Sequence, residues 1–380
     1  MRLFEVKTSY KNILNEGIVH PEDKIWTDGV AGAKDALDGL RKMSTGKELT
    51  TIKWDGFPAL IFGRDADGRL IITDKHMFDK KDEAGIVRSP EEFKQYDINR
   101  GADRSDLWKK IDILWPRLEQ IIPKSFKGFY WGDLLYTGKL NPTNGYFVFR
   151  PNTVTYKVKA DSPIGKSIAG SVAGIAVHGF IPGIGQKDSP LNGLGGLPAG
   201  GAPIWFATGE MPTPKIALDN ATMNAAQSAI SKYDSDVHKF LNDLTAMKAK
   251  GLLGLGTKYI NSKITQGNLN DLFDGFYDYL SMNLSGAMSK KLLGDPPGNG
   301  WLYNEGKTGL YGMFAIWTAL YNLKLNIKRQ IDAQQANNDV QAFTGEDPGH
   351  EGYVVGGGED KFKLIDRLSF SKENFNKIRT

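Results

Sequence analysis

Lys53-Trp54-Asp55-Gly56 follows the strand-like run Thr50-Thr51-Ile52 and precedes a second apolar run, Ala59-Leu60-Ile61-Phe62. The turn residues Asp65-Ala66-Asp67-Gly68 separate this second run from a third, Leu70-Ile71-Ile72. Short apolar runs divided by turn residues predict a β-hairpin that begins just after the lysine. The sequence thus presents a lysine at a strand end, beside a carboxylate and beside a glycine that allows a ligand to approach the backbone closely.

A lysine in this setting can serve as a nucleophile towards a nucleotide's α-phosphate. The amine attacks only when it is neutral, so burial or neighbouring cations must favour the uncharged form. The three defining residues alone occur by chance in about one chain in ten of this length. The interpretation therefore depends on the partners that the rest of the chain supplies.

The composition indicates a folded protein with ordinary residue usage. The 380 residues include 40% hydrophobic and 24% charged ones, and this length favours two domains or one domain with a large insertion. The formal charge of +4, from 48 basic and 44 acidic residues, does not by itself indicate a nucleic-acid partner. Cys is absent, which excludes disulfides, thiolate nucleophiles and Cys-ligated metal sites, and the five His make a His-rich metal cage improbable.

Neither a secretion signal nor a membrane span is expected. The first residues, Met1-Arg2-Leu3-Phe4-Glu5-Val6-Lys7, contain no apolar core of a signal peptide, so a cytoplasmic location is expected. Residues 164–185 are apolar but are interrupted by Lys166, Pro182 and several Gly. They are interpreted as a buried strand at Ile175-Ala176-Val177 followed by a loop.

The pattern along the chain predicts an α+β fold rich in antiparallel strands. Residues 1–46 are expected to form an N-terminal helical cap, with a helix over 31–43. Residues 47–210 are expected to be strand-rich, with a helix near 106–122 and a long loop at 186–202. Apolar residues then recur at helical spacing, so 211–340 is expected to be a helical insertion before the final strands and a short helix in 341–380.

Five further groups of polar or aromatic residues follow Lys53 in order. They are Asp74-Lys75-His76, Trp131-Gly132-Asp133-Leu134, Tyr146-Phe147-Val148-Phe149, Glu351-Gly352-Tyr353-Val354-Val355 and Lys361-Phe362-Lys363. Asp133 and Glu351 are placed at strand ends, and the two lysines of the last group share one face of a strand because strand side chains alternate. The ordered set is far more specific than any single group.

In this order the set resembles the covalent nucleotidyl transferase superfamily, which includes ATP-dependent RNA and DNA ligases and messenger-RNA capping enzymes. The general layout is most similar to ligase-like proteins of large tailed phages, for which the location would be the host cytoplasm. The resemblance implies that Lys53 carries AMP through a phosphoramidate bond. Lys361 and Lys363 would favour the neutral form of Lys53 by like-charge repulsion and offset charge that develops on the phosphate. Asp133 and Glu351 would be oxygen ligands of Mg²⁺ or Mn²⁺, or acceptors for ribose hydroxyls.

The resemblance also implies a nucleotide site. Its residues would be Ile52, Asp55, Gly56, Lys75, Asp133, Phe147 and Lys363. One of Phe147 and Phe149 would stack on the adenine, and Phe147 is the preferred residue.

The chain departs from the superfamily pattern at three points. Phe57-Pro58 stands where Arg or Ser is common, so Arg64 or Lys75 would take over the phosphate or sugar contact. Asp133 replaces the usual Glu and has a shorter reach. The stretch after Lys363 leaves no room for a C-terminal OB domain, which weakens a capping activity and makes RNA-ligase-like enzymes the nearer comparison.

Taken singly, these residues have ordinary interpretations. Lys53, Lys361 and Lys363 could be solvated strand lysines, and Asp133 could cap a turn. His76, His178 and His350 are interpreted as structural histidines rather than ligands. The order of the set is what favours a functional site.

The sequence therefore predicts an ATP-dependent polynucleotide ligase that joins 5′-phosphate and 3′-hydroxyl ends, with a preference for RNA or RNA/DNA hybrids. The expected partners are nucleic-acid ends, with no membrane, and the protein is taken to be a monomer. A DNA nick-sealing ligase or another nucleotidyl transferase is the first alternative. A non-catalytic phage protein that binds nucleic acid is the second.

Overall fold

The computed structural model describes residues 18–48, 50–78, 86–186, 189–190, 194–195, 197, 203–209, 211, 213–335, 338–345, 347–356 and 361–370. Contacts between residues divide the chain into two units. The first unit contains Ile52–Met211 and Gln335–His350, and the second contains Ile18–Thr51, Pro212–Gln334 and residues 351–370. The fold is mixed α/β with antiparallel-rich sheets, as the sequence predicts.

The first unit combines two sheets with short helices. Its helices are α2 (Lys75–Phe78), α3 (Pro90–Asn99), α4 (Ser105–Ile121) and α5 (Pro163–Ala169). The larger sheet consists of β2 (Ala59–Arg64), β3 (Leu70–Asp74), β4 (Gly128–Thr137), β7 (Ala173–Ile181), β8 (Ser189–Pro190) and β9 (Ile204–Ala207). Its strand order is β3-β2-β4-β7-β8, and β9 pairs with β7 in parallel. The second sheet has the order β11-β10-β6-β5 and consists of β5 (Tyr146–Phe149), β6 (Val154–Lys159), β10 (Val340–Thr344) and β11 (Asp347–Pro348).

The hairpin predicted after Lys53 is confirmed. Strands β2 and β3 pair in antiparallel register, with Phe62 opposite Ile72. The side chain of Asp65 closes the turn, because its Oδ1 accepts hydrogen bonds from the backbone N–H groups of Asp67 and Arg69. The turn chemistry of the sequence therefore sets the register of the strands that follow the lysine.

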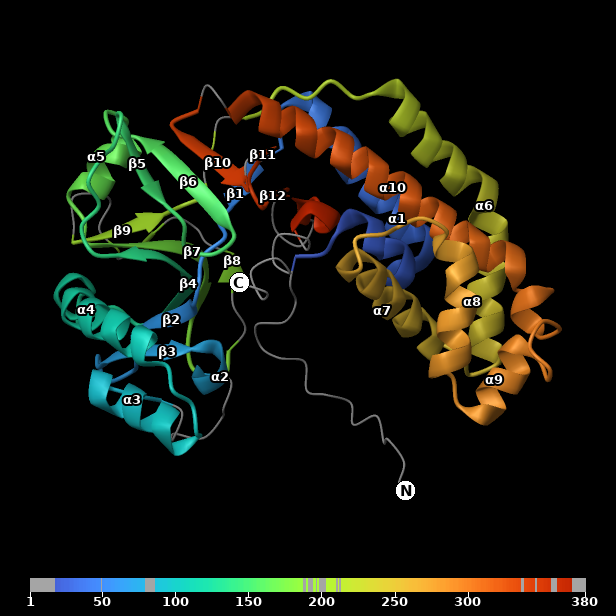
Figure 1. Ribbon diagram of the computed structural model, residues 1–380, viewed down its shortest axis with the longest axis horizontal. Helices are drawn as coiled ribbons and strands as arrows, with labels where there is room; N and C mark the ends of the chain where they lie inside the picture. The colour runs from blue at the N-terminus through green and yellow to red at the C-terminus, as the bar shows by residue number, and fades with distance from the viewer. Residues whose placement is uncertain are drawn as a thin grey trace. The chain divides into compact units, whose positions relative to one another are not determined.

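Helices α3 and α4 cover one face of the larger sheet (Figure 1). Apolar residues of α4, such as Ile111 and Leu114, pack against Leu60 and Phe62 of β2 in one buried core. Residues at the intervening strand positions face the other way. Ile61 belongs instead to a smaller cluster with residues such as Ile71 and Phe129, against which Trp131 packs. The two faces of this sheet thus differ, and the less covered one carries the polar residues described below.

The second unit is mainly helical. Its helices are η1 (Pro21–Asp23), α1 (Lys24–Lys42), η2 (Met43–Thr45), α6 (Asn220–Ala246), α7 (Gly251–Thr265), α8 (Leu272–Asn283), α9 (Gly286–Leu293), η4 (Trp301–Tyr303) and α10 (Lys307–Gln334). It also contains β12 (Gly352–Val355), β13 (Phe362–Ile365) and the first two residues of β1 (Thr50–Lys53), which belong to a small sheet of order β1-β12-β13. Strand β1 leads out of this sheet into the first unit, since Thr51 belongs to the second unit and Ile52 to the first.

Helices α6 and α10 are long and lie side by side (Figure 1). Two glycines of α10 allow this close packing. A Cβ atom at Gly309 would lie 2.4 Å from Cβ of Phe240, and one at Gly312 would lie 2.7 Å from Cβ of Tyr233. Because the partner positions on α6 decrease as those on α10 increase, the two helices are antiparallel.

Several element predictions are confirmed and others missed. The helix over 31–43, the helix near 106–122, the helical block and the final strands are present. The sequence did not predict α3, α5 or β6. Contacts place α1, β12 and β13 with the helical block, where the sequence predicted a separate cap and a return to the strand-rich domain. Much of the loop expected at 186–202, and residues 371–380 of the expected final helix, lie outside the described residues.

Candidate functional site

The residues on either side of Lys53 are firmly anchored. The backbone N–H of Ile52 donates to the carbonyl of Gly209 at 2.6 Å, and Trp54 Nε1 donates to the carbonyl of Thr208 at 3.1 Å. The indole of Trp54 is buried, with its ring centroid 4.7 Å from that of Tyr156. Lys53 itself is half-buried at the end of β1. The hydrogen bonds of Ile52 and Trp54 thus fix the backbone on both sides of Lys53.

Asp55 is a buried acceptor that ties this segment to the loop before β6. Its Oδ1 accepts from Asn152 Nδ2 at 2.8 Å, and its Oδ2 accepts from the backbone N–H groups of Thr153 at 2.6 Å and Val154 at 2.8 Å. Its own backbone N–H donates to the hydroxyl of Tyr156 at 2.6 Å. The predicted nucleotide contact of Asp55 therefore competes with three bonds inside the protein, and these bonds fix the loop that follows Lys53.

Gly56 brings the segment against Asp133. A Cβ atom at Gly56 would lie 2.6 Å from Cβ of Asp133 and 2.9 Å from the carbonyl oxygen of Leu134. The backbone N–H of Phe57 donates to the Leu134 carbonyl, and the N–H of Leu134 donates to the Pro58 carbonyl, both at 3.0 Å. Any larger residue at position 56 would push the two segments apart. Two sequence groups that were predicted to act together are thus in direct contact.

Asp133 lies on β4 and is paired with a histidine. Its Oδ2 is 3.0 Å from Nε2 of His178 on β7, and both side chains are about one-fifth exposed, at 20% and 21%. The ring of Trp131 is 4.9 Å from that of His178. This group of a carboxylate, an imidazole and an indole can accept a hydroxyl, hold a cation or lie against a base. The sequence interpretation of His178 as merely structural missed this contact, since nothing in the sequence links positions 45 residues apart.

Arg64 is not available for a phosphate, contrary to the prediction. It is 1% exposed, and its Nε and Nη2 donate to the carbonyl of Ile122 at 2.9 and 2.7 Å. Its Nη1 donates to the Gly68 carbonyl and to the carboxylate of Glu119. Arg64 instead holds α4 to the hairpin. Of the two candidates, Lys75 remains, as the first residue of α2 directly after β3.

A charged cluster lies beside Lys75. Arg100 and Arg104 each bind both Asp74 and Asp97. Burial acts to raise the pKa of Asp97, but hydrogen bonds from Arg104, Trp108 and Arg100 outweigh it and lower the pKa. This network fixes the start of α4 and the end of α3 against the end of β3.

Phe147 and Phe149 point to the same side of β5. They are 2% and 6% exposed, whereas Val148 between them is 44% exposed. The ring of Phe149 packs 5.2 Å from Tyr136. The alternation expected for a strand is confirmed, and the stacking of either ring on adenine stays a prediction.

The remaining predicted site residues lie in the second unit. Glu351 is buried directly before β12. On β13, Phe362 and Leu364 are buried, so Lys363 between them lies on the opposite, half-buried face, and the half-buried Lys361 directly precedes the strand. Lys363 pairs with Val354 of β12 and donates its backbone N–H to the carbonyl of Val19 at 3.0 Å. That the two lysines share one strand face stays a prediction, because only Lys363 belongs to β13.

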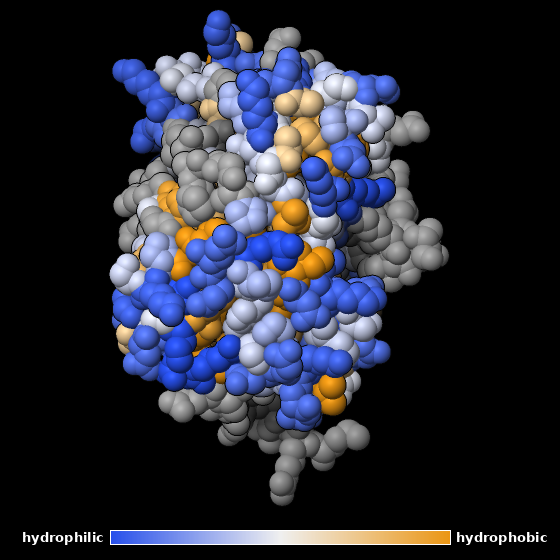
Figure 2. All heavy atoms as spheres, turned by 90° about the vertical axis from the view of Figure 1, so that its left-hand side faces the viewer, coloured by the Kyte–Doolittle hydropathy of each residue, from blue (hydrophilic) through white to orange (hydrophobic). Residues whose placement is uncertain are grey.

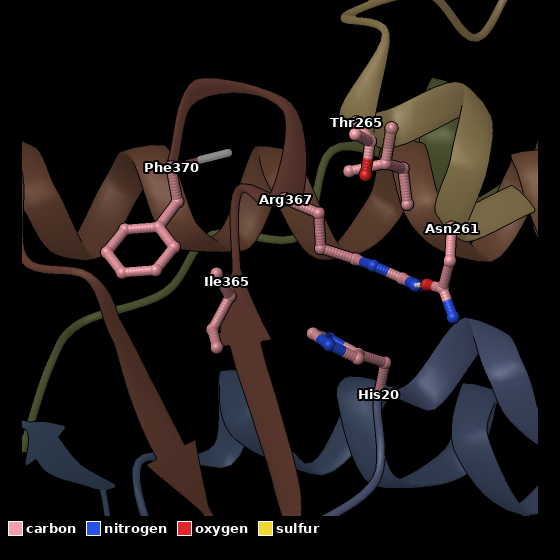
Figure 3. A pocket seen from close by; sticks show the side chains of 7 residues that line it. His20, Asn261, Thr265, Ile365, Arg367 and Phe370 are labelled. Carbon is pink, nitrogen blue, oxygen red and sulfur yellow. Dashed lines mark hydrogen bonds between the residues drawn. The ribbon is translucent and has the colours of Figure 1, made fainter. Parts of the chain in front are cut away.

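The second unit also contains a pocket of about 330 Å³ (Figure 3). In the close-up, His20 and Asn261 lie to one side of Arg367, with Ile365 and Phe370 to the other. Arg367 donates to both carboxylate oxygens of Asp23, at 2.9 and 3.1 Å. It also bonds to Asn261 and approaches Glu22, which is paired with the buried Lys324. The cations at this pocket are thus compensated by carboxylates.

The site and fold define a mixed α/β protein with a lysine-bearing loop packed on a strand carboxylate. Residues 15–379 match a family of unknown function (DUF6267), and the chain belongs to this family. No curated protein and no solved structure matches the chain. Among the described residues, none of the helices combines the length and apolar character needed to cross a membrane. Within the same part of the chain, no three His, Asp or Glu side chains form a group suited to a metal ion.

Asp55→Ala is expected to lower the free energy of unfolding by about 2–4 kcal/mol, because it leaves two buried backbone N–H groups and an amide without their acceptor. Asp55→Asn should lower the free energy of unfolding by less than half as much. Its amide oxygen, placed where Oδ2 lies, can still accept hydrogen bonds from the backbone N–H groups of Thr153 and Val154. Urea unfolding of both variants measures the difference. Asp67→Ala, in the exposed turn, serves as the control and should change stability by less than about 0.5 kcal/mol. Equal losses for Asp55→Ala and Asp67→Ala would contradict the anchoring role.

Proposed function

We propose that this protein is an ATP-dependent nucleotidyl transferase that seals polynucleotide ends. The observation that carries the proposal is the contact of Gly56 with Asp133, which joins the Lys53 loop to the carboxylate that the resemblance pairs with it. The anchoring of Ile52, Trp54 and Asp55 supports the same conclusion, because a covalent nucleophile must be held in one position relative to its substrate.

In the proposed first step, neutral Nζ of Lys53 attacks the α-phosphorus of ATP. The P–N bond forms as the bond from the α-phosphorus to the bridging oxygen breaks, and pyrophosphate leaves with the bonding electrons. The nitrogen loses a proton to solvent. AMP is then transferred to the 5′-phosphate of a strand, which releases the lysine. The 3′-hydroxyl of a second strand finally displaces AMP, forms the phosphodiester and gives up its proton.

The donor set of the first unit fits a nucleotide with a bound Mg²⁺ ion. Such an ion is commonly held by one or two carboxylates together with substrate phosphates, so a cluster of three protein carboxylates is not required. Asp133 is partly exposed and is the proposed oxygen ligand, with His178 fixing the orientation of its carboxylate. When bound, Mg²⁺ would offset negative charge on the phosphates.

Glu351, Lys361 and Lys363 belong to the second unit, and their parts in the reaction rest on the resemblance of the motifs. The nature of the strands rests on the same resemblance, which favours RNA or RNA-containing ends over DNA alone.

Labelling with radioactive nucleotides tests the proposal. The purified protein, incubated with Mg²⁺ and ATP labelled at the α-phosphate, is expected to carry the label through a denaturing gel, and ATP labelled at the γ-phosphate should leave it unlabelled. Labelling by α-labelled GTP instead would assign a different nucleotide. Absence of any label would overturn the covalent mechanism. With ATP established, sealing of end-labelled RNA and DNA nicks then identifies the preferred strands.

A further inference from the structure

A hollow of about 250 Å³ lies in the first unit, directly beyond the lysine loop. Its lining residues are Phe57, Lys110, Leu134, Leu135, Tyr136, Thr137, Phe149, Arg150 and Pro151. Phe57 follows Gly56 and is tied by its backbone N–H to the Leu134 carbonyl, so the hollow adjoins both the Lys53 loop and the strand of Asp133.

Phe57 is exposed at this hollow although it is a large apolar residue. Its side chain is 64% exposed, while the neighbouring Trp54 is 2% exposed. An isolated exposed aromatic residue is common on protein surfaces, but this one borders a concave site with further aromatic rings, Tyr136 and Phe149, in its lining. The backbone on both sides of Phe57 is fixed to β4, so its ring is presented by a rigid loop.

The charge at the hollow is positive and uncompensated. Lys110 of α4 and Arg150, just after β5, line it, and no acidic residue is among the lining residues that the structure describes. Neither cation forms an ion pair with any residue that the structure describes. Lys109, the neighbour of Lys110, by contrast pairs with Asp106 at 3.4 Å. The pocket of the second unit also differs, because its Arg367 is paired with carboxylates.

The surface of the first unit exposes apolar groups among hydrophilic ones. Figure 2, which faces the side of Figure 1 where the first unit is drawn, shows them in orange near the middle of the face, bordered by blue hydrophilic groups. An aromatic platform flanked by cations is the combination with which proteins bind single-stranded nucleic acid, because bases stack on the ring while phosphates are attracted by the cations.

We propose that this hollow binds a single-stranded segment of the polynucleotide substrate, with a base stacked on Phe57 and backbone phosphates near Lys110 and Arg150. The inference rests on the proposed function and adds to it the surface that holds the strand. An acidic peptide would satisfy the two cations but would leave the exposed ring without a stacking partner, so we favour a nucleic acid.

Fluorescence anisotropy with a labelled single-stranded RNA oligonucleotide, and with DNA of the same sequence, tests the assignment on the full chain. Phe57→Leu keeps an apolar side chain but removes the stacking face, and it is expected to weaken binding about tenfold. Phe57→Trp should bind as tightly as the wild type or more tightly. Ile98→Ala, which alters another exposed apolar residue of the first unit, should have no effect.

The salt dependence tests the two cations separately. Each of Lys110→Gln and Arg150→Gln should lower the slope of log affinity against log salt concentration by about 0.7, the value for one contact with a single strand. Lys109→Gln, on the same helix, should leave the slope unchanged.

Wild-type affinity for Phe57→Leu together with unchanged slopes would overturn the inference, as would undetectable binding by the wild type. Competition by a poly-glutamate peptide at equal concentration would overturn it in favour of an acidic protein partner. AMP labelling of the same preparations keeps the two proposals apart. Loss of labelling with intact, Phe57-dependent binding contradicts the transferase mechanism alone, and normal labelling without such binding contradicts the docking site alone.

Discussion

Lys53→Arg is expected to abolish the transfer of AMP to the protein. Arginine keeps the positive charge and nearly the length of lysine, but its guanidinium stays protonated at all accessible pH values and has no lone pair with which to attack phosphorus. The anchors at Ile52, Trp54 and Asp55 do not involve the Lys53 amine, so the loop should keep its conformation. The expected result is a folded protein without covalent label.

The measurement is retention of α-labelled AMP on a denaturing gel, with thermal unfolding recorded for the same sample. Lys139→Arg, at an exposed position of the first unit, is the matched control and should label as the wild type does. If Lys53→Arg still acquires AMP, another residue is the nucleophile. If both arginine variants lose the label, the assay reports general damage rather than the loss of one amine.

Glu22→Ala is expected to produce the largest loss of stability, about 3–5 kcal/mol, because it leaves a buried cation without its partner. Glu22 and Lys324 are both 0% exposed and form an ion pair, and Arg367 approaches the same carboxylate at 3.5 Å. Burial lowers the pKa of Lys324 from its ordinary value, and attraction to Glu22 acts in the opposite direction. Removing the Glu22 carboxylate therefore leaves the unfavourable effects of burial and of Arg367, which are opposed only by the weaker attraction to Asp23.

Chemical denaturation at several pH values measures this effect. Between the lowered pKa of Lys324 in the folded state and the ordinary value of about 10.4, the unfolded chain binds more protons, so the stability of Glu22→Ala should rise with pH across that window. The control is Asp38→Ala, which breaks the exposed Asp38–Arg41 pair and should cost less than about 1 kcal/mol. The double variant Glu22→Leu/Lys324→Met should recover most of the loss, and a double variant as unstable as Glu22→Ala would contradict a charge-based explanation.

Local patterns predicted the elements that depend on local chemistry. The hairpin that follows Lys53 is encoded by two apolar runs and by Asp65, whose side chain closes the turn within four residues. The final strands expected in residues 341–380 are present as β12 and β13, where short runs of mostly apolar residues are buried. Alternation also places Phe147 and Phe149 on one side of β5, although it does not identify the layer they meet.

The contacts that shape the candidate site were beyond such reasoning. The groups that donate hydrogen bonds to Asp55 lie 97–99 positions further along the chain. Asp133 on β4 contacts His178 on β7, and these two strands pair with an irregular register. Arg64 looked like a cation available to a phosphate, but its partners lie on α4 and are fixed only when the helix packs on the sheet. Single-sequence patterns indicate which residue types are present, whereas their pairing depends on the tertiary fold.

The division of the chain has a practical consequence for experiments with fragments. The backbone passes from one unit to the other after Thr51, Met211, Gln334 and His350, so neither unit corresponds to one continuous stretch of sequence. No simple truncation isolates either unit, because each unit is built from separate stretches of the chain. Producing the Lys53-bearing unit alone would require joining Met211 to Gln335 through a designed linker, so that the β10 strand can still complete its sheet beside β6.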